Sequence, residues 1–408
     1  MDIHRQIIQW ALDKNLIRDR MSFIAGPRQV GKTTAIRNFL KKSGQAEIYY
    51  NWDTPTVKKR YAKNPIFFTE DVPPQLPVAW VALDEIHKYP KWKNILKGYY
   101  DEFKGKFQFI VTGSAMLETF RKSGDSLVGR YFLFHMLPLG VWDITGPMPP
   151  AENMWNPTEV LSSVPEADKI IFDASQNLLS ITGFPEPLVA GTKEFCTKWR
   201  EDHISLIIRE DLRDLSRIIH LQKLEALLYL LPQHVASPLS INSLTNPLEC
   251  AHGALKTWLL ALQKVYLIFP ILPWTIKVAR SIRKEAKYYF WDWGIVENEG
   301  GRFENFVAVM LFRAVSAWNE WGKGVFKLHY LRTKDGREVD FAISERGRLV
   351  LIVEAKSKET NVSPDLIYFK EKLGVSLAIQ VVNKDGYCTM KGKNLYVMGI
   401  DRLLKLLP

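Results

Sequence analysis

One octapeptide near the N-terminus constrains the fold of this chain more than any other segment. It runs Gly26-Pro27-Arg28-Gln29-Val30-Gly31-Lys32-Thr33 and fits the pattern G-x-x-x-x-G-K-[ST] at every fixed position. The apolar residues from Met21 to Ala25 predict a strand before it, and Gly31 to Lys42 predict a helix after it. This is the context in which the pattern binds nucleotide phosphates, whereas a chance glycine-rich turn is the alternative.

The residue types of this loop suit ATP with Mg²⁺. Glycines let the backbone wrap a phosphate with its N–H groups exposed. We expect Lys32 to neutralise the β- and γ-phosphates and the Thr33 hydroxyl to coordinate Mg²⁺. The expected nucleotide-binding residues are Gly26, Pro27, Arg28, Gln29, Val30, Gly31, Lys32, Thr33 and Thr34.

A second apolar segment, from Val78 to Leu83, ends in Asp84 and Glu85. Ligands of parallel sheets bind at the carboxyl ends of the strands, which is where this pair lies. About fifty residues after a phosphate-binding loop, Asp84 is expected to hold Mg²⁺ through water and Glu85 to polarise the attacking water. Further strand-like segments at Glu47–Asn51 and Phe107–Thr112 predict an α/β parallel sheet covered by helices on both faces.

Two features after this pair resemble parts of AAA+ ATPases. The strand-like segment Phe109 to Ser114 is similar to the AAA+ strand whose hydroxyl or amide groups sense the γ-phosphate, with Thr112 and Ser114 as the candidate residues. A simple exit from a strand into a turn has the same pattern and is the alternative. Arg130, before the strand-like Tyr131 to Phe134, is a candidate arginine finger for a neighbouring subunit of a homo-oligomer. A surface arginine is the alternative.

Nearly the whole chain resembles a prokaryotic family of AAA+ ATPases with an uncharacterised C-terminal region. The resemblance implies a P-loop ATPase followed by a winged helix and a PD-(D/E)xK nuclease-like domain, and it leaves the biological role open. Trp293 is a departure, because the family commonly has a smaller residue there. The segments that carry the resemblance are Gly26–Thr34, Leu83–His87, Thr112–Ser114, Gly129–Arg130, Pro138–Leu139, Gly183–Pro187 and Tyr289–Gly294.

The length of 408 residues exceeds one typical domain. We expect an ATPase core over 1–143, a linker and helical lid over 144–219, a winged helix over 220–280 and a nuclease-like domain over 281–408. The three cysteines lie far apart and form no metal or disulfide pattern. Neither a signal peptide nor a membrane-spanning run is evident, so a cytoplasmic protein is expected.

The middle region predicts helix, short helix, helix and then a strand at Val265 to Phe269, the order of a winged helix. Its third helix, Ala251 to Lys264, is expected either to enter a DNA groove or to pack against protein. The candidate base contacts on this helix are Lys256, Trp258, Gln263 and Lys264.

Charge favours nucleic acid as a partner, with DNA preferred. The net charge is +11, and the densest basic cluster is Lys277, Arg280, Arg283, Lys284 and Lys287. This cluster is either a phosphate-contacting edge or a solvated hairpin.

The C-terminal region resembles the PD-(D/E)xK core through Asp340, Glu354 and Lys356, with Glu304 from a preceding helix. Glu354 and Lys356 are two residues apart on a predicted strand and therefore face the same side. With Glu304, the carboxylates of Asp340 and Glu354 are expected to share a second divalent cation, and Lys356 to orient water or stabilise charge. A nuclease fold kept as a scaffold is the alternative. The chain is thus expected to be an ATPase acting on or regulated by nucleic acid. Its rivals are an ATP-gated protein-interaction regulator with an inactive nuclease-like domain and an ATP-dependent nuclease in defence or repair.

Overall fold

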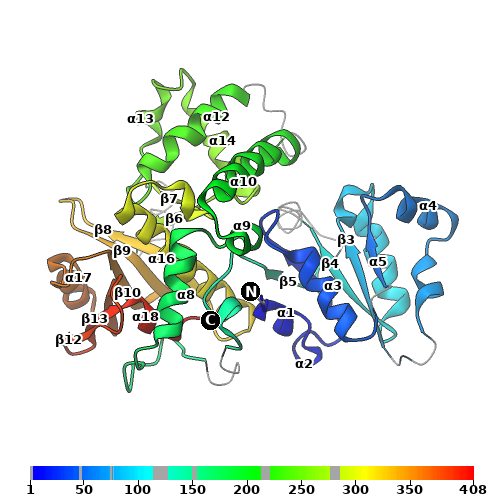
Figure 1. Ribbon diagram of the computed structural model, residues 1–408, viewed down its shortest axis with the longest axis horizontal. Coiled ribbons are helices and arrows are strands. Elements are labelled where there is room, and N and C mark those ends of the chain that lie inside the picture. Colours follow the sequence, from blue (N-terminus) through cyan, green and yellow to red (C-terminus); the bar gives the residue numbers. More distant parts are fainter. Residues whose placement is uncertain are drawn as a thin grey trace. The chain divides into compact units, whose positions relative to one another are not determined.

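The computed structural model describes residues 3–45, 48–73, 76, 78–113, 127–148, 154–212, 221–275 and 285–408. The chain divides into two compact units (Figure 1). The N-terminal unit is Arg5–Leu137, and the C-terminal unit comprises Met1–His4 and Pro138–Pro408. Among the helices in these ranges, none combines the length and apolar character needed to cross a bilayer.

The described residues of the N-terminal unit form a five-stranded sheet in the order β2-β3-β4-β1-β5. Every neighbouring pair is parallel, which confirms the α/β class predicted from the sequence. Parallel neighbours need crossover connections, and helices lie in the connections that the structure describes, those between β1 and β2, β2 and β3, and β3 and β4. The strands are β1 (Met21–Ala25), β2 (Tyr49–Asn51), β3 (Ala79–Asp84), β4 (Phe107–Thr112) and β5 (Tyr131–His135).

Helices cover both faces of this sheet because alternate strand residues point to opposite sides. On one face, Val81 packs in a buried cluster with Trp92 of α5 (Trp92–Phe103). On the other, the Trp80 ring meets Phe39 of α3 (Lys32–Lys42) edge-on at 5.2 Å. The remaining helices of this unit's described part are α1 (Gln6–Ala11), α2 (Lys14–Ile17) and α4 (Pro55–Lys63).

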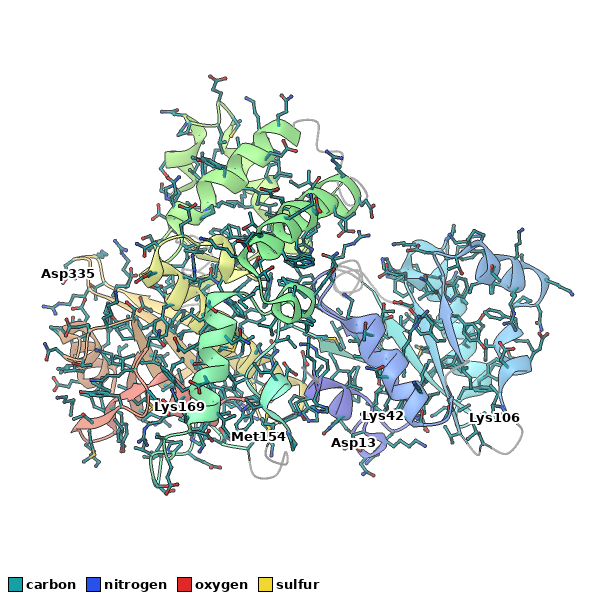
Figure 2. All side chains as sticks on the ribbon, viewed as in Figure 1. Asp13, Lys42, Lys106, Met154, Lys169 and Asp335 are labelled. Carbon is teal, nitrogen blue, oxygen red and sulfur yellow. The ribbon has the colours of Figure 1, made fainter. Side chains whose placement is uncertain are left out.

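Two helix ends of the N-terminal unit show favourable terminal interactions. Asp13, labelled in Figure 2, accepts a hydrogen bond from the Asn15 N–H at 2.9 Å and caps α2. Lys42, also labelled there, lies exposed in the last turn of α3, where a cation interacts favourably with the helix dipole.

The C-terminal unit contains an eight-stranded mixed sheet in the order β12-β13-β11-β10-β9-β8-β6-β7, counted over its described residues. Its strands are β6 (Ile268–Pro273), β7 (Lys287–Phe290), β8 (Phe326–Arg332), β9 (Glu338–Glu345), β10 (Arg348–Lys356), β11 (Leu377–Val382), β12 (Cys388–Gly392) and β13 (Leu395–Gly399). Its α-helices are α7 (Trp142–Thr145), α8 (Lys169–Ser180), α9 (Pro185–Ala190), α10 (Lys193–Leu206), α12 (Leu221–Leu230), α13 (Ile241–Thr245), α14 (His252–Lys264), α16 (Glu299–Glu320), α17 (Pro364–Leu373) and α18 (Ile400–Leu406).

The middle region has the predicted helix order, but its strand begins later than predicted. We expected the strand at 265–269, whereas β6 begins at Ile268, because Tyr266 has a positive φ of 56° and turns the chain after α14. β6 pairs with β7 and also, in parallel, with β8. The two strands that follow the three helices therefore belong to the same sheet as β9 and β10. The predicted boundary at 280 falls within residues 276–284, outside the described ranges.

A buried asparagine joins α16 to β7. The side chain of Asn305 accepts a hydrogen bond from the Phe290 N–H at 2.9 Å and donates one to the Phe290 carbonyl at 2.7 Å. This pair of bonds fixes the N-terminal half of α16, which carries Glu304, against β7, which carries Lys287.

Candidate functional site

The phosphate-binding loop joins β1 to α3 and needs glycine at two positions. Gly26 has φ 152°, and a Cβ there would lie 2.1 Å from the Met136 carbonyl oxygen. Gly31 has φ 97° and forms the N-terminal cap of α3. A side chain at either position would strain the backbone, and at Gly26 it would also collide with the neighbouring chain.

Lys32 lies over this loop rather than in solvent. Its Nζ donates to the carbonyl oxygens of Gly26 at 2.9 Å and Pro27 at 2.7 Å. The ammonium is thus held inside the loop whose N–H groups are suited to phosphate. The other predicted binding residues share the loop: Arg28 is half-buried, Gln29 is exposed, Val30 is buried, and Thr34 is exposed in the first turn of α3.

Asp84, at the carboxyl end of β3, is the centre of a hydroxyl network. It is 3% exposed, and the Thr33 hydroxyl donates to its Oδ2 at 2.9 Å. The hydroxyls of Tyr49 and Thr112 also donate to this carboxylate. A buried carboxylate is stable when such donors satisfy it. Three neighbouring segments, α3, β2 and β4, therefore fix the orientation of Asp84.

Tyr49 was not among the residues predicted from the sequence. Its ring lies under the Arg37 guanidinium, 4.4 Å from the ring centroid. Burial, followed by the charge of Asp84, raises the pKa of Tyr49 well above its ordinary value, so the phenol remains a hydrogen-bond donor. Its sequence signal was its place next to the end of a predicted strand, but the pairing of β2 with β3 was needed to connect it to Asp84.

Glu85 follows Asp84 in a left-handed conformation, with φ 58°. Its N–H donates to the Thr112 carbonyl at 2.9 Å, which ties the turn to β4. Non-glycine residues with such a φ are uncommon and are held by their surroundings, often at functional sites.

Burial and charged neighbours together set the pKa of Glu85. Burial raises the pKa of Glu85, the Lys88 ammonium opposes that rise, and Asp84 adds to it. The Lys88 Nζ lies 3.4 Å from Glu85 Oε2 and 2.6 Å from Asp53 Oδ2. His87 is also close to Glu85, with Nε2 3.5 Å from Oε2, but burial lowers the pKa of His87 to about 4, so it is neutral at pH 7.

The two remaining candidates of this unit have different outcomes. Ser114 lies outside the described residues. Arg130 precedes β5, at the amino ends of the parallel strands, whereas the phosphate-binding loop follows their carboxyl ends. Its guanidinium forms two hydrogen bonds with Asp101, at 2.9 and 3.2 Å. Within its own chain Arg130 is therefore placed away from the nucleotide loop, and a role in trans stays a prediction.

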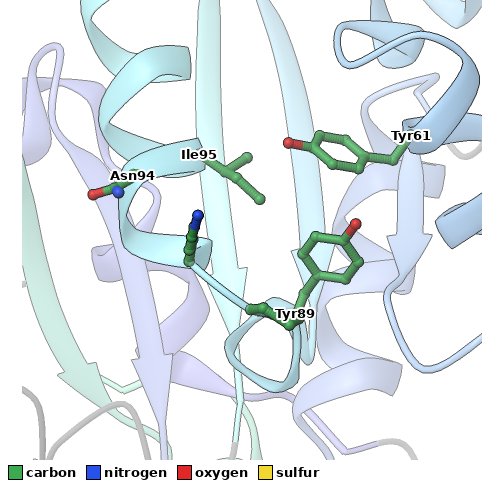
Figure 3. A pocket seen from close by; sticks show the side chains of 6 residues that line it. Tyr61, Tyr89, Asn94 and Ile95 are labelled. Atoms are coloured by element: carbon green, nitrogen blue, oxygen red, sulfur yellow. The ribbon is translucent and has the colours of Figure 1, made fainter.

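An open pocket of about 620 Å³ adjoins the turn that carries Glu85. In Figure 3 the phenol of Tyr61 points into it, with Tyr89 below and Asn94 and Ile95 on the facing helix. Pro90 and Lys91 complete its lining. Tyr61 and Tyr89 are half-buried, and each packs against the fully buried Trp52 ring with centroids 5.1 Å apart, so both rings are supported by the core.

The structure brings the four predicted C-terminal residues together around an additional lysine. Asp340 of β9 accepts from the Ala355 N–H of β10 at 3.0 Å, next to Glu354. Lys356 Nζ lies 2.9 Å from Glu354 Oε1, in agreement with their shared face. Glu304 of α16 lies on the other side of Asp340, and one ammonium bridges them.

That ammonium belongs to Lys287, which is fully buried. Its Nζ lies 2.6 Å from Glu338 Oε1, 3.2 Å from Asp340 Oδ1 and 3.3 Å from Glu304 Oε1. We predicted Lys287 as a member of an exposed basic cluster; this prediction is wrong, because the lysine is neutralised inside the unit. The other members, Lys277, Arg280, Arg283 and Lys284, lie outside the described residues.

Burial dominates the ionisation of this cluster. It raises the pKa of Glu304 to about 8, with Asp340 adding to the rise and Lys287 opposing it. It raises the pKa of Glu354 to about 7 by the same combination of burial and Asp340, opposed by Lys356. The three carboxylates around Lys287 hold its pKa well above its ordinary value despite burial, so this ammonium stays charged.

The arrangement does not fit a second divalent cation. Glu304 and Asp340 already accept hydrogen bonds from Lys287, and Asp340 also accepts from a backbone N–H. A divalent ion about 4 Å from the ammonium would be repelled by roughly 8 kcal/mol at an effective dielectric constant of about 20. Within the described residues, no group of three or more His, Cys, Asp or Glu side chains is arranged to hold a metal.

The candidate base contacts of the middle region are only partly accessible. Lys256 and Lys264 are exposed on α14 and Gln263 is half-buried. Trp258 is 5% exposed and packs inside the unit, so its predicted role as a base contact is wrong. α14 thus presents two lysines and no exposed aromatic candidate.

Comparison with known proteins agrees with the geometry of the N-terminal unit. Residues 18–145 match the AAA domain family. This match and the parallel sheet support a nucleotide-binding AAA+ ATPase of P-loop fold. After the AAA domain, residues 173–301 and 299–403 match two families described as domains of unknown function, DUF8612 and DUF4143.

The curated relatives to which this chain is similar are named without a function. Uncharacterised proteins of Mycobacterium bovis and Mycobacterium tuberculosis are each 23% identical over 367 residues, covering 85% of this chain and 73% of the relative. Among solved structures, the Aeropyrum pernix ORC1 protein in complex with DNA is 14% identical, with a TM-score of 0.35 over 75% of this chain and 94% of that chain. Thermococcus gammatolerans McrB AAA+ hexamers with bound McrC give 12% identity and a TM-score of 0.19 over 43% and 48%. Likenesses this remote support no functional inference.

Proposed function

We propose that this protein binds ATP with Mg²⁺ and hydrolyses it in the N-terminal unit. The observation that carries the proposal is the hydrogen-bond network at Asp84. It joins the hydroxyl of Thr33, the last residue of the phosphate-binding motif, to the carboxylate at the end of β3. The loop N–H groups and Lys32 would hold the β- and γ-phosphates, and Thr33 and Asp84 would hold Mg²⁺, which supplies charge neutralisation to the transferred phosphoryl group.

Glu85 is the proposed base that orients and polarises the attacking water. It is adjacent to Asp84, its backbone is fixed by Thr112, and Lys88 favours its charged form. Thr112 positions Asp84 through its hydroxyl and is proposed to sense the γ-phosphate together with Ser114.

Two substitutions test this division of roles. Lys32→Ala should abolish tight ATP binding, because the phosphates lose their cation. Glu85→Gln should retain binding and lose turnover by about 10²–10⁴-fold, the usual contribution of a general base. Fluorescent-nucleotide titration and phosphate release measure the two steps separately. Wild-type turnover in Glu85→Gln contradicts the assignment of the base.

We further propose that nucleic acid, DNA in preference, stimulates this ATPase. The net charge is +11, and the pocket beside the Glu85 turn offers supported aromatic rings with a lysine at its rim. Unpaired bases stack on such rings and a backbone phosphate pairs with such a cation. Lys91 of the pocket lining is exposed, and the helices that carry Tyr61 and Asn94 have further exposed lysines, Lys59 and Lys63 on α4 and Lys97 on α5.

Phosphate release with and without single- and double-stranded DNA and RNA tests this link. Replacing Tyr89 and Lys91 by alanine should remove the stimulation and leave the basal rate in place. Lys42→Ala, an exposed lysine on the last turn of α3, is the matched control. An ATPase rate that no nucleic acid changes favours the first rival, an ATP-gated protein-interaction regulator that assembles as a homo-oligomer.

The second rival, an ATP-dependent nuclease with a second divalent cation, has a specific observation against it. Lys287 already occupies the carboxylates that the metal needs. A C-terminal unit that serves as a scaffold or partner-binding module agrees better with this arrangement, and Mn²⁺-dependent cleavage by the wild-type protein would reverse that preference.

A further inference from the structure

We propose that Lys287 acts as a built-in cation in the C-terminal carboxylate cluster. It takes the place of a divalent metal, and removing its ammonium opens a site for a hard divalent cation such as Mn²⁺ or Mg²⁺. The cluster comprises Glu304, Glu338, Asp340 and Glu354.

The donor count of Lys287 matches its surroundings. A lysine ammonium has three N–H donors and no acceptor. Three oxygens from three different carboxylates, those of Glu338, Asp340 and Glu304, lie within 3.3 Å of its Nζ. All three donors can therefore be satisfied by carboxyl oxygens, and the lysine side chain has no exposure to solvent. Hydrogen bonds that involve a charged donor are stronger than neutral ones, so the ammonium is firmly held.

The fold places this lysine in advance. Lys287 pairs with Ile271 in the β6–β7 ladder and forms an isolated bridge with Pro238. Three residues later, Phe290 is bound through its N–H and carbonyl to the Asn305 side chain of α16. Because Glu304 is the neighbour of Asn305, the contact that fixes the helix also fixes the carboxylate against the lysine.

Aromatic residues close the remaining sides. The Tyr289 hydroxyl donates to Glu304 Oε1 at 2.7 Å, and the Tyr330 ring centroid is 5.7 Å from Lys287 Nζ. The ammonium thus faces acceptors and aromatic surface, which is a built cation site rather than an accidental ion pair.

One carboxylate oxygen at this site has no partner among the described residues. Glu354 is 4% exposed, and its Oε2 is buried without a hydrogen bond, while its Oε1 pairs with Lys356. An unsatisfied buried acceptor is costly, so this oxygen is available to a cation that enters the cluster once Lys287 is removed. Without Lys287, oxygens of Glu304, Glu338 and Asp340 lose their shared cation, and Glu354 Oε2 has no hydrogen-bond partner in the described part of the chain even with Lys287 present. Carboxylate oxygens are the ligand chemistry of Mg²⁺ and Mn²⁺.

Mn²⁺ titration followed by electron paramagnetic resonance tests the proposal on the full-length chain without nucleotide. Wild-type protein should show no site that depends on Asp340. Lys287→Met, which keeps the length and removes the charge, should gain one Mn²⁺ site at least tenfold tighter than any in the wild type. The gain should disappear in Lys287→Met with Asp340→Asn, which locates the metal in this cluster.

Circular dichroism separates loss of the site from loss of the fold. If Lys287→Met folds only when Mn²⁺ is added, the metal has replaced the lysine and the proposal stands. If it does not fold at all, Lys287→Met with Glu338→Gln removes one carboxylate with the ammonium and repeats the test on a less charged cluster. A wild-type Mn²⁺ site that Asp340→Asn abolishes, or a folded Lys287→Met variant that gains no Mn²⁺, overturns the proposal.

Discussion

Removing Lys88 should make ATP turnover more sensitive to acid. The Lys88 ammonium lies 3.4 Å from Glu85 Oε2 and favours the ionised form of that carboxylate. A general base works only when ionised. In Lys88→Met, protonation of Glu85 becomes easier, so the acid-side loss of activity should begin at a higher pH than in the wild type.

The size of the effect follows from the geometry. Two unit charges 3.4 Å apart interact by about 1.2 kcal/mol in a water-like dielectric, which is the appropriate choice because the Lys88 side chain is 35% exposed. Its loss changes the proton affinity of Glu85 by about 1 kcal/mol, or roughly fivefold in the ratio of protonated to ionised forms. The difference should shrink in high salt, since the pair is partly exposed.

Asp53 provides a control of opposite sign. It lies 2.6 Å from the same ammonium, and its negative charge raises the pKa of Glu85. Asp53→Asn should therefore move the acid limb to lower pH, while Lys88→Met moves it higher. The assay is phosphate release at saturating ATP from pH 5 to 8 for the three proteins. Equal acid limbs in all three, or shifts in the same direction, refute Glu85 as the base.

Three further predictions concern the loop, assembly and the C-terminal fold. Gly26→Ala should lose nucleotide binding in fluorescence titration, because its Cβ would lie 2.1 Å from a backbone oxygen; retained affinity contradicts the observed loop. If Arg130 acts in trans, mixing Arg130→Ala with Lys32→Ala subunits should restore some ATPase activity, and a wild-type rate per subunit that is independent of dilution argues against it. Asn305→Ala should destabilise the C-terminal unit by about 2–4 kcal/mol in urea, since two buried backbone groups lose their partner; a loss under 1 kcal/mol means that water replaces it.

The nucleotide loop was predictable because its information is local. The spacing from Gly26 to Thr33 places a glycine at two of the three positions where the backbone has positive φ, Gln29 being the third, and a lysine where it can reach the loop. Asp84 was also predictable from a local pattern, because it directly follows a run of apolar strand residues. The donors to Asp84 are less local, because Tyr49 reaches it only through the pairing of β2 with β3.

The C-terminal four residues were also identified from local patterns, through the i, i+2 spacing of Glu354 and Lys356 and their likeness to a nuclease core. Their partner was missed because it lies on β7, outside the strands that carry the pattern. A signal was present: Lys287 and Tyr289 are two residues apart in a short aromatic strand, so they share a face, and both contact Glu304. A lysine on the inner face of such a strand needs an internal carboxylate.

The burial of Lys287 changes which positive charges of the chain are available to bind nucleic acid. The net charge of +11 counts Lys287 equally with lysines such as Lys91, but the first is neutralised by buried carboxylates and the second is exposed beside an aromatic pocket. Only cations that contact phosphate release counterions, so the salt dependence of DNA binding should respond to Lys91→Ala and not to charge removed inside the cluster. A dense run of basic residues in a sequence therefore does not by itself identify a nucleic-acid-binding surface. Whether each lysine can bind phosphate depends on whether carboxylates contact it in the folded chain.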